Sequence, residues 1–126
     1  MNDLEKNRPL SPHLQVYKWQ LSSLLSITHR LTSLINIAAI SLVCFWIISL
    51  YLGENCYKYF QILSSSKVGK FILIGFTWSF CYHLLNGLRH LSWDFGYGYE
   101  IKIANFSGAL VVIVSFLLTT ALWFFV

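Results

Sequence analysis

The sequence predicts an all-α integral membrane protein, with three transmembrane helices and an N-terminal segment lying along the inner membrane surface. Hydrophobic residues make up 56% of the 126 residues and charged residues only 11%, and the mean hydropathy is +0.61. Three apolar runs each approach the roughly 20 residues that cross a bilayer. A soluble domain of this length would not carry such runs. We therefore expect one membrane domain covering residues 1–126.

The net charge of +4 does not indicate a nucleic-acid partner. The charged side chains cluster at the ends of the apolar runs, where they set topology and meet lipid head groups or cofactor carboxylates. Cys44, Cys56 and Cys81 are an odd number without CxxC spacing. They predict neither a disulfide framework nor a zinc site. We expect the chain to be surrounded by membrane lipid.

Residues 1–23 form a polar lead-in to the first apolar run. Pro9 and Pro12 each push the preceding residue out of the helical region, which favours an extended or turning chain. Trp19 belongs to an aromatic belt at head-group level. The apolar run that follows has no small-residue cleavage pattern, so we expect no signal peptide.

The first predicted span, about residues 24–52, begins with unusually polar turns. Ser26 and Arg30 are four residues apart and project from one face, and His29 is offset from Arg30 by about 100°. We interpret these residues as a polar pocket at the inner edge of the bilayer. The alternative is that Arg30 reaches the head groups as a topology signal. Residues 53–66 are predicted to be a plain connector on the far side.

The second predicted span, about residues 68–91, contains the strongest functional signal. His83, Gly87 and His90 follow at i, i+4 and i+7, so they share one helix face. An imidazole inside a membrane is by default a functional-site hypothesis, and a glycine one turn further on lets a flat ligand approach the backbone. We predict a haem plane along this face, with His83 as an axial iron ligand roughly 12 Å below the inner surface.

Other basic groups lie nearer the surface, at the depth expected for the haem propionates. His29, Arg30, Arg89 and His90 could donate charge-assisted hydrogen bonds to these carboxylates. The alternative is that His83 only hydrogen-bonds a neighbouring helix. His29 lies too near the surface to be the second axial ligand without tilting the haem, so we favour a ligand from another subunit. The chain is then half of a two-subunit haem-binding helix bundle.

The third predicted span, about residues 104–126, is apolar, with small residues at positions suited to helix packing. Orientation follows from lysine and arginine, which are commoner on the cytoplasmic or matrix side. The N-terminal side and the connector between the second and third spans hold Lys6, Arg8, Lys18, Arg30, Arg89 and Lys102, against Lys58, Lys67 and Lys70 on the other side. We expect the N-terminus on the cytoplasmic or matrix side.

The Ser26 and Arg30 pair also suits a quinone. A ring with two carbonyls needs a hydroxyl donor and a cationic or protonic donor at the membrane edge, because charge develops on its oxygens during reduction. This spacing on its own is a weak signal.

Several stretches resemble the cytochrome b556 subunit family of succinate dehydrogenase, most closely its mitochondrial and alphaproteobacterial type. The resemblance runs from end to end of the chain and includes the three-span pattern. Its residues are Asn7-Arg8-Pro9-Leu10-Ser11-Pro12-His13, Tyr17 and Trp19, Ser26-Ile27, His29-Arg30 with Thr32, His83, Asn86-Gly87, Arg89-His90-Leu91 and Trp93-Asp94.

The resemblance implies roles for individual positions. The position matching His83 is an axial ligand of haem b, and a second membrane-anchor subunit supplies the other axial histidine. The remaining implied positions form two sets: the haem-propionate region with His29, Arg89 and His90, and the ubiquinone pocket with Ser26 and Arg30, flanked by Ile27 and Trp19.

The implied function is that of a membrane anchor of succinate:ubiquinone oxidoreductase, complex II of the respiratory chain and tricarboxylic acid cycle, which passes electrons from succinate to ubiquinone. The chain has no dinucleotide fingerprint or cysteine cluster, so it is expected to oxidise no succinate itself. Its expected partners are a flavoprotein, an iron–sulfur protein and a second small anchor. It would lie in a bacterial inner membrane or the mitochondrial inner membrane. The alternatives are a stand-alone transmembrane b-type cytochrome and a haem-free assembly or packing protein.

Overall fold

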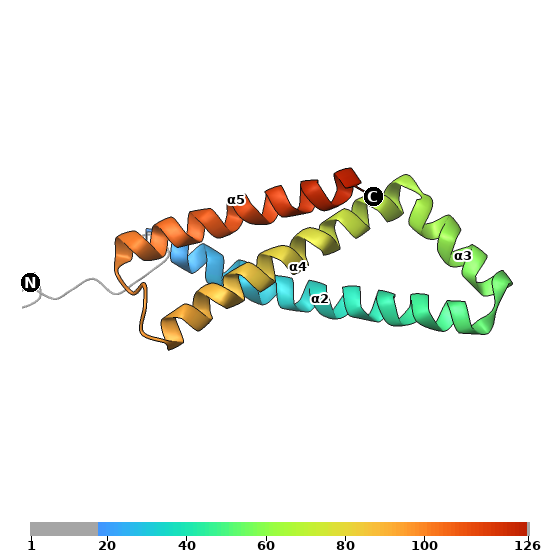
Figure 1. Cartoon of the computed structure of the whole chain (residues 1–126), viewed down its shortest axis with the longest axis horizontal. Helices are drawn as coiled ribbons and strands as arrows, with labels where there is room; N and C mark the ends of the chain where they lie inside the picture. The colour runs from blue at the N-terminus through green and yellow to red at the C-terminus, as the bar shows by residue number, and fades with distance from the viewer. Residues whose placement is uncertain (1–17, 126) are drawn as a thin grey trace, which may run out of the picture.

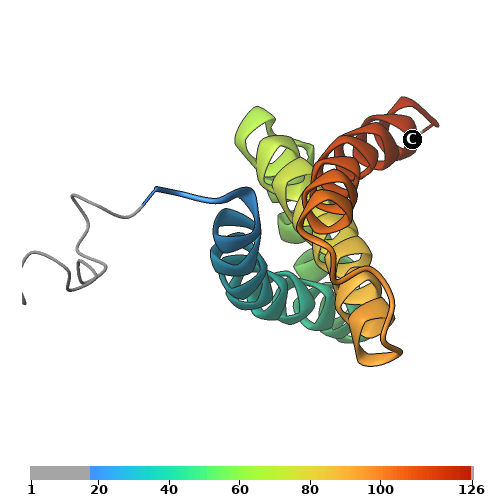
Figure 2. The same cartoon turned by 90° about the vertical axis from the view of Figure 1, so that its left-hand side faces the viewer.

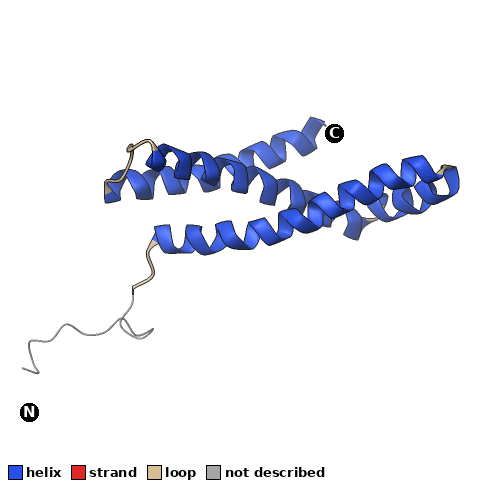
Figure 3. Cartoon of the chain, turned by 90° about the horizontal axis from the view of Figure 1, so that it is seen from below, coloured by secondary structure: helices blue, strands red, loops and turns tan. Residues whose placement is uncertain are grey.

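A computed structural model describes residues 18–125, and this part of the chain is entirely helical apart from short connections (Figures 1 and 3). The helices are α2 (Leu21–Leu52), α3 (Glu54–Ser65), α4 (Lys67–Asp94) and α5 (Ile101–Phe125). Three of them, α2, α4 and α5, are long and apolar enough to cross a membrane. The predicted all-α transmembrane class is confirmed. Most of the expected interfacial segment lies outside the described residues.

Helix α4 is the centre of the bundle. It runs diagonally between α2 and α5 and contacts both (Figures 1 and 2). Leu25 of α2, Tyr82 of α4 and Val111 of α5 are buried together where the three helices meet. A Cβ added at Gly108 would lie 2.3 Å from Leu25 Cδ1, so glycine permits the close approach of α2 and α5.

The helices extend beyond the predicted apolar spans on the side of the N-terminus. Helix α2 begins at Leu21, α4 ends at Asp94 and α5 begins at Ile101, whereas hydropathy places these boundaries at about residues 24, 91 and 104. Apolar composition marks the part of a helix that lies in lipid, while the backbone hydrogen bonds continue through the polar interface. The start of α2 and the α4–α5 connection lie at one end, and α3 lies at the other (Figure 1).

The prediction of a plain connector over residues 53–66 is wrong, because most of this stretch is the helix α3. Gly53, with φ of +104°, interrupts the helical backbone between α2 and α3. Glu54 and Lys58 form an i, i+4 ion pair of 3.0 Å in the first turns. The half-buried Phe60 and Ser64 are also four residues apart. This spacing is a helical signal in a stretch too polar to be recognised as a span.

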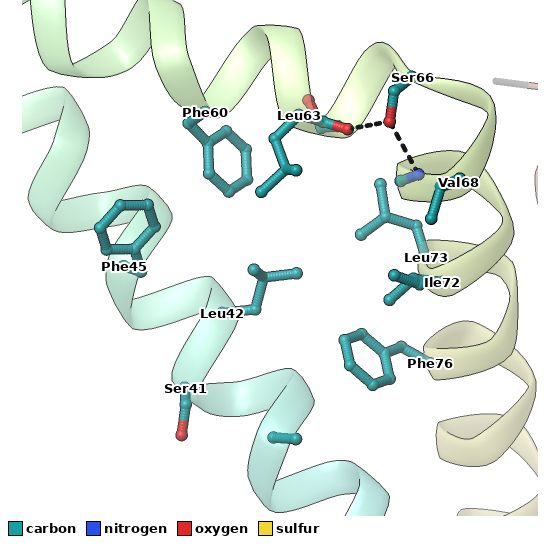
Figure 4. A pocket seen from close by; sticks show the side chains of 13 residues that line it. Ser41, Leu42, Phe45, Phe60, Leu63, Ser66, Val68, Ile72, Leu73 and Phe76 are labelled. Carbon is teal, nitrogen blue, oxygen red and sulfur yellow. Dashed lines mark hydrogen bonds between the residues drawn. The ribbon is translucent and has the colours of Figure 1, made fainter.

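Helices α2, α3 and α4 line an apolar cavity of about 430 Å³ that is open on one side (Figure 4). Phe45 and Phe60 face it from α2 and α3, with ring centroids 6.2 Å apart. The corner into α4 is closed by Ser66, whose Oγ donates to Leu63 O over 2.7 Å and accepts from Gly69 N at 3.0 Å. None of the predicted site residues lines this cavity.

Candidate functional site

Three imidazole rings gather between α2 and α4. The His29 and His83 rings are stacked, with centroids 4.0 Å apart and planes inclined by 8°. His29 also stacks on His90, with a centroid distance of 5.2 Å and an angle of 16°. All three side chains are half-buried. The structure therefore brings together the three histidines that the sequence singles out as intramembrane candidates.

The ring nitrogens of the cluster have different surroundings. His83 Nδ1 lies 3.2 Å from the hydroxyl of Thr32, and His90 Nδ1 lies 2.8 Å from the backbone oxygen of Asn86. His29 Nδ1 is buried without a hydrogen-bond partner within residues 18–125. A buried polar atom without a partner is costly, which favours a ligand group beside His29.

A cavity of about 590 Å³ extends from His83 along α2 and α4. This volume is within the range of about 300–1,000 Å³ for cofactor and small-molecule pockets. The wall is mainly apolar and comprises Ser33, Asn36, Ile37, Ala39, Ile40, Val43, Thr77, Phe80 and His83. One turn beyond His83, a Cβ added at Gly87 would meet no atom within 4 Å. The helix face of His83 and Gly87 is therefore open to a flat group.

These features fit haem. His83 offers a nitrogen, the mainly apolar cavity would accommodate an apolar macrocycle, and His29 and His90 add polar groups in the ring stack that begins at His83. The stacking also bears on the second axial ligand. Two histidines that held one iron would each direct a ring nitrogen at it, whereas the His29 and His83 rings meet face to face. This arrangement does not suit His29 and His83 as a pair of ligands to one iron.

Arg89 has a different environment from the histidines. Its side chain is buried, and its Nε and Nη2 donate to Ser107 Oγ at 3.0 Å and to Ala104 O at 2.9 Å, both on α5. Its guanidinium also lies 4.2 Å from the centroid of the Trp93 ring. The sequence predicts Arg89 beside His90 at the propionates, and the structure places its guanidinium against α5.

The predicted quinone residues lie on the more exposed side of α2. Ser26 is half-buried, Arg30 is exposed, and Ile27 and Trp19 are 45% and 57% exposed. Ser26 and Arg30 share a helix face, as their spacing predicts, but neither lines the two cavities described above.

Sequence reasoning missed two contributors to the site. Thr32 has no predicted role of its own, yet its hydroxyl is the polar partner of His83. Asn36 lines the cavity and accepts a hydrogen bond of 2.9 Å from Ser79. The available signal was spacing, because His29, Thr32 and Asn36 recur at i, i+3 and i+7 on one face of an otherwise apolar helix.

Comparison with known proteins identifies the family. A family model described as succinate dehydrogenase/fumarate reductase transmembrane subunit matches residues 5–122. The chain belongs to this family. It is 46% identical to the succinate dehydrogenase cytochrome b556 subunit of Rickettsia prowazekii over 121 residues, covering 96% of this chain and 94% of that relative.

More distant members of the family match as fully along the chain. The cytochrome b556 subunit of Paracoccus denitrificans is 40% identical, over 95% of this chain and 94% of its own length. The mitochondrial cytochrome b560 subunit of Sus scrofa is 36% identical, over 95% of this chain and 72% of its own length. The resemblance read from the motifs is confirmed. The chain is a multi-pass membrane subunit of a succinate dehydrogenase-type complex.

Proposed function

We propose that this chain is the haem-binding membrane anchor of a succinate:ubiquinone oxidoreductase and helps to pass electrons from succinate to ubiquinone. The observation that carries the proposal is the His83 ring, which borders a cofactor-sized cavity and has a hydroxyl partner on Nδ1. The names of the relatives, cytochrome b556 and cytochrome b560 subunits of succinate dehydrogenase, support haem b as the cofactor.

In this proposal His83 would hold the haem iron through Nε2, and a histidine of a second small anchor subunit would supply the other ligand. Haem b, when bound, supplies a one-electron carrier. His29 and His90 would hold the propionate end, with Nε2 of His90 directed to it because Nδ1 is taken by Asn86 O. Arg89 adds positive charge to the propionate region, while its hydrogen bonds to α5 hold α4 in position.

Ser26 and Arg30 form this chain's wall of the ubiquinone site, and Ile27 and Trp19 flank it. The hydroxyl and the guanidinium are donors to quinone oxygens, where negative charge develops on reduction. Exposure of the Arg30 side chain fits a pocket that other subunits complete.

The proposed partners are a second small anchor, an iron–sulfur subunit and a flavoprotein subunit. The last two carry the succinate chemistry, and this chain has no catalytic activity alone. We place the complex in a bacterial inner membrane or the mitochondrial inner membrane, with the N-terminus on the cytoplasmic or matrix side. A stand-alone cytochrome b that moves electrons across the bilayer is less favoured, since His29, His83 and His90 form a single cluster.

Arg30→Gln in the assembled complex tests the quinone assignment. Loss of a charged hydrogen bond of about 1.5–3 kcal/mol would lower quinone-reductase turnover roughly ten- to hundredfold. Haem content and succinate oxidation with an artificial acceptor should stay unchanged. Ubiquinone turnover equal to that of the unaltered complex would remove Arg30 from the site.

A further inference from the structure

Thr32 lies at the centre of the α2–α4 contact, where its hydroxyl has two partners. The residue is 1% exposed. Its Oγ1 donates to the backbone oxygen of His29 over 2.9 Å and lies 3.2 Å from Nδ1 of His83. A hydroxyl carries one proton and two lone pairs. Because the proton is used on the backbone, Oγ1 meets His83 as an acceptor.

The direction of this hydrogen bond determines the tautomer of His83. An accepting oxygen requires the proton of the neutral ring on Nδ1, which leaves the lone pair on Nε2. A metal-bound imidazole needs that free lone pair, and a hydrogen bond from its other nitrogen orients the ring and increases its basicity. The stacked His29 ring, 4.0 Å away, restricts rotation of His83 further.

We propose that Thr32 is a positioning residue for haem ligation, which presents Nε2 of His83 to the iron. This inference rests on the proposed role of His83. Other threonines of the bundle show which of these hydrogen bonds are common. Thr120 and Thr119 donate only to preceding backbone oxygens of their own helix, which is a common hydrogen bond of threonine in helices. Thr32 does this and also accepts from another helix. Thr77 likewise donates to Leu73 O and accepts from Trp123 of α5, but the partner of Thr32 is a histidine ring that borders the cavity.

The test compares Thr32→Val with Thr32→Ser in the complete complex, purified in detergent. Valine keeps the shape and removes the hydroxyl, whereas serine keeps the hydroxyl and removes a methyl group. Thr120→Val is the matched control, because it makes the same change at an exposed site. Readouts are the rate of haem transfer to excess apomyoglobin and the haem midpoint potential from redox titration.

Outer partners of metal-bound histidines typically contribute ten- to hundredfold to affinity. Thr32→Val should therefore speed haem loss by about ten- to a hundredfold and make the midpoint potential more positive, because a less basic ligand stabilises ferric iron less. Thr32→Ser and Thr120→Val should stay within about twofold of the unaltered complex. Thr32→Ala, which adds no apolar bulk, gives the same readouts if the valine variant does not assemble.

Two results would overturn the inference: an unchanged rate and potential in Thr32→Val, or an equal loss in Thr32→Ser, which would indicate packing alone. His83→Ala measured in parallel separates this failure from that of the proposed function. If His83→Ala changes the rate of haem loss and the midpoint potential but Thr32→Val does not, His83 remains the proposed ligand and only the positioning role of Thr32 is rejected. If His83→Ala has no effect, the proposed function itself fails.

Discussion

Arg30 and Arg89 illustrate how residues of one type acquire different tasks from their surroundings. Both lie in predicted spans near the same end, and both are candidates for anionic groups by charge alone. Arg89 is 6% exposed and bonded to α5, while Arg30 is exposed on α2. Because Arg89 is buried and hydrogen-bonded, it connects α4 to α5. Because Arg30 is exposed, its guanidinium is available to a ligand.

Arg89→Gln should lower the stability of the complex, because it removes the hydrogen bonds to Ser107 and Ala104 of α5. Interhelical hydrogen bonds in membranes contribute about 0.6 kcal/mol each on average and up to about 1.7, so we expect a loss of about 1–2 kcal/mol in detergent-induced unfolding. Arg30→Gln is the matched control and should unfold normally. A normal unfolding curve for Arg89→Gln with reduced haem affinity would instead assign Arg89 directly to the propionates.

At the scale of elements, α4 combines packing with ligand access on its different faces. Asn86 and Arg89 are buried, whereas Gly87 faces open space. Sequence spacing predicts the shared face of His83, Gly87 and His90 because helical geometry alone determines it. It could not predict which neighbour Arg89 would bind, since that depends on how α5 packs.

Gly87→Leu should lower the haem content of the complex without preventing assembly. Overfilling a packed site costs about 1–3 kcal/mol, equivalent to a drop in affinity of roughly five- to hundredfold. Gly75→Leu is the control, because a Cβ at Gly75 also meets no atom within 4 Å and the residue lies in the same helix. Equal haem content in both variants would mean that the open space at Gly87 receives no haem.

Helix α3 shows where sequence patterns are weakest. Its 12 residues are too few and too polar to form a span, so hydropathy predicts a connector. The helix becomes recognisable from the Glu54–Lys58 pair and from the break at Gly53. The spacing of the charged residues and the glycine turn therefore indicate this helix, whereas hydropathy averaged over a window of residues does not.

At the scale of the whole molecule, the sequence predicts the class, the three spans and the shared face of His83 and His90, because each follows from local composition or helical period. The stacking of His29 on His83 depends on how α2 packs against α4. The contact of Thr32 with His83 and the burial of Arg89 needed the packing of three helices. The second axial ligand and the rest of the quinone wall belong, in our proposal, to other subunits. No pattern within one chain could supply them.

The proposed orientation predicts which side of the membrane reaches each end of the bundle. Cys56 in α3 should react with a membrane-impermeant maleimide only from the outer side, in a chain with Cys44→Ala and Cys81→Ala. Tyr97→Cys in the α4–α5 connection, with Cys56→Ala added, should react only from the inner side, since Tyr97 is 73% exposed. Labelling of the two sites in the opposite sense would reverse the orientation, and labelling of both from one side would contradict three crossings.

The most direct test of the account is the haem of the purified complex carrying His83→Ala, measured as haem per complex together with its absorption spectrum and midpoint potential. Leu84→Ala is the control, because Leu84 is the next residue of α4 and is 53% exposed. We predict that His83→Ala lowers haem content and changes the spectrum and potential of any haem that remains, while Leu84→Ala changes neither. An assembled His83→Ala complex with full haem, an unaltered spectrum and an unaltered potential would contradict His83 as the iron ligand.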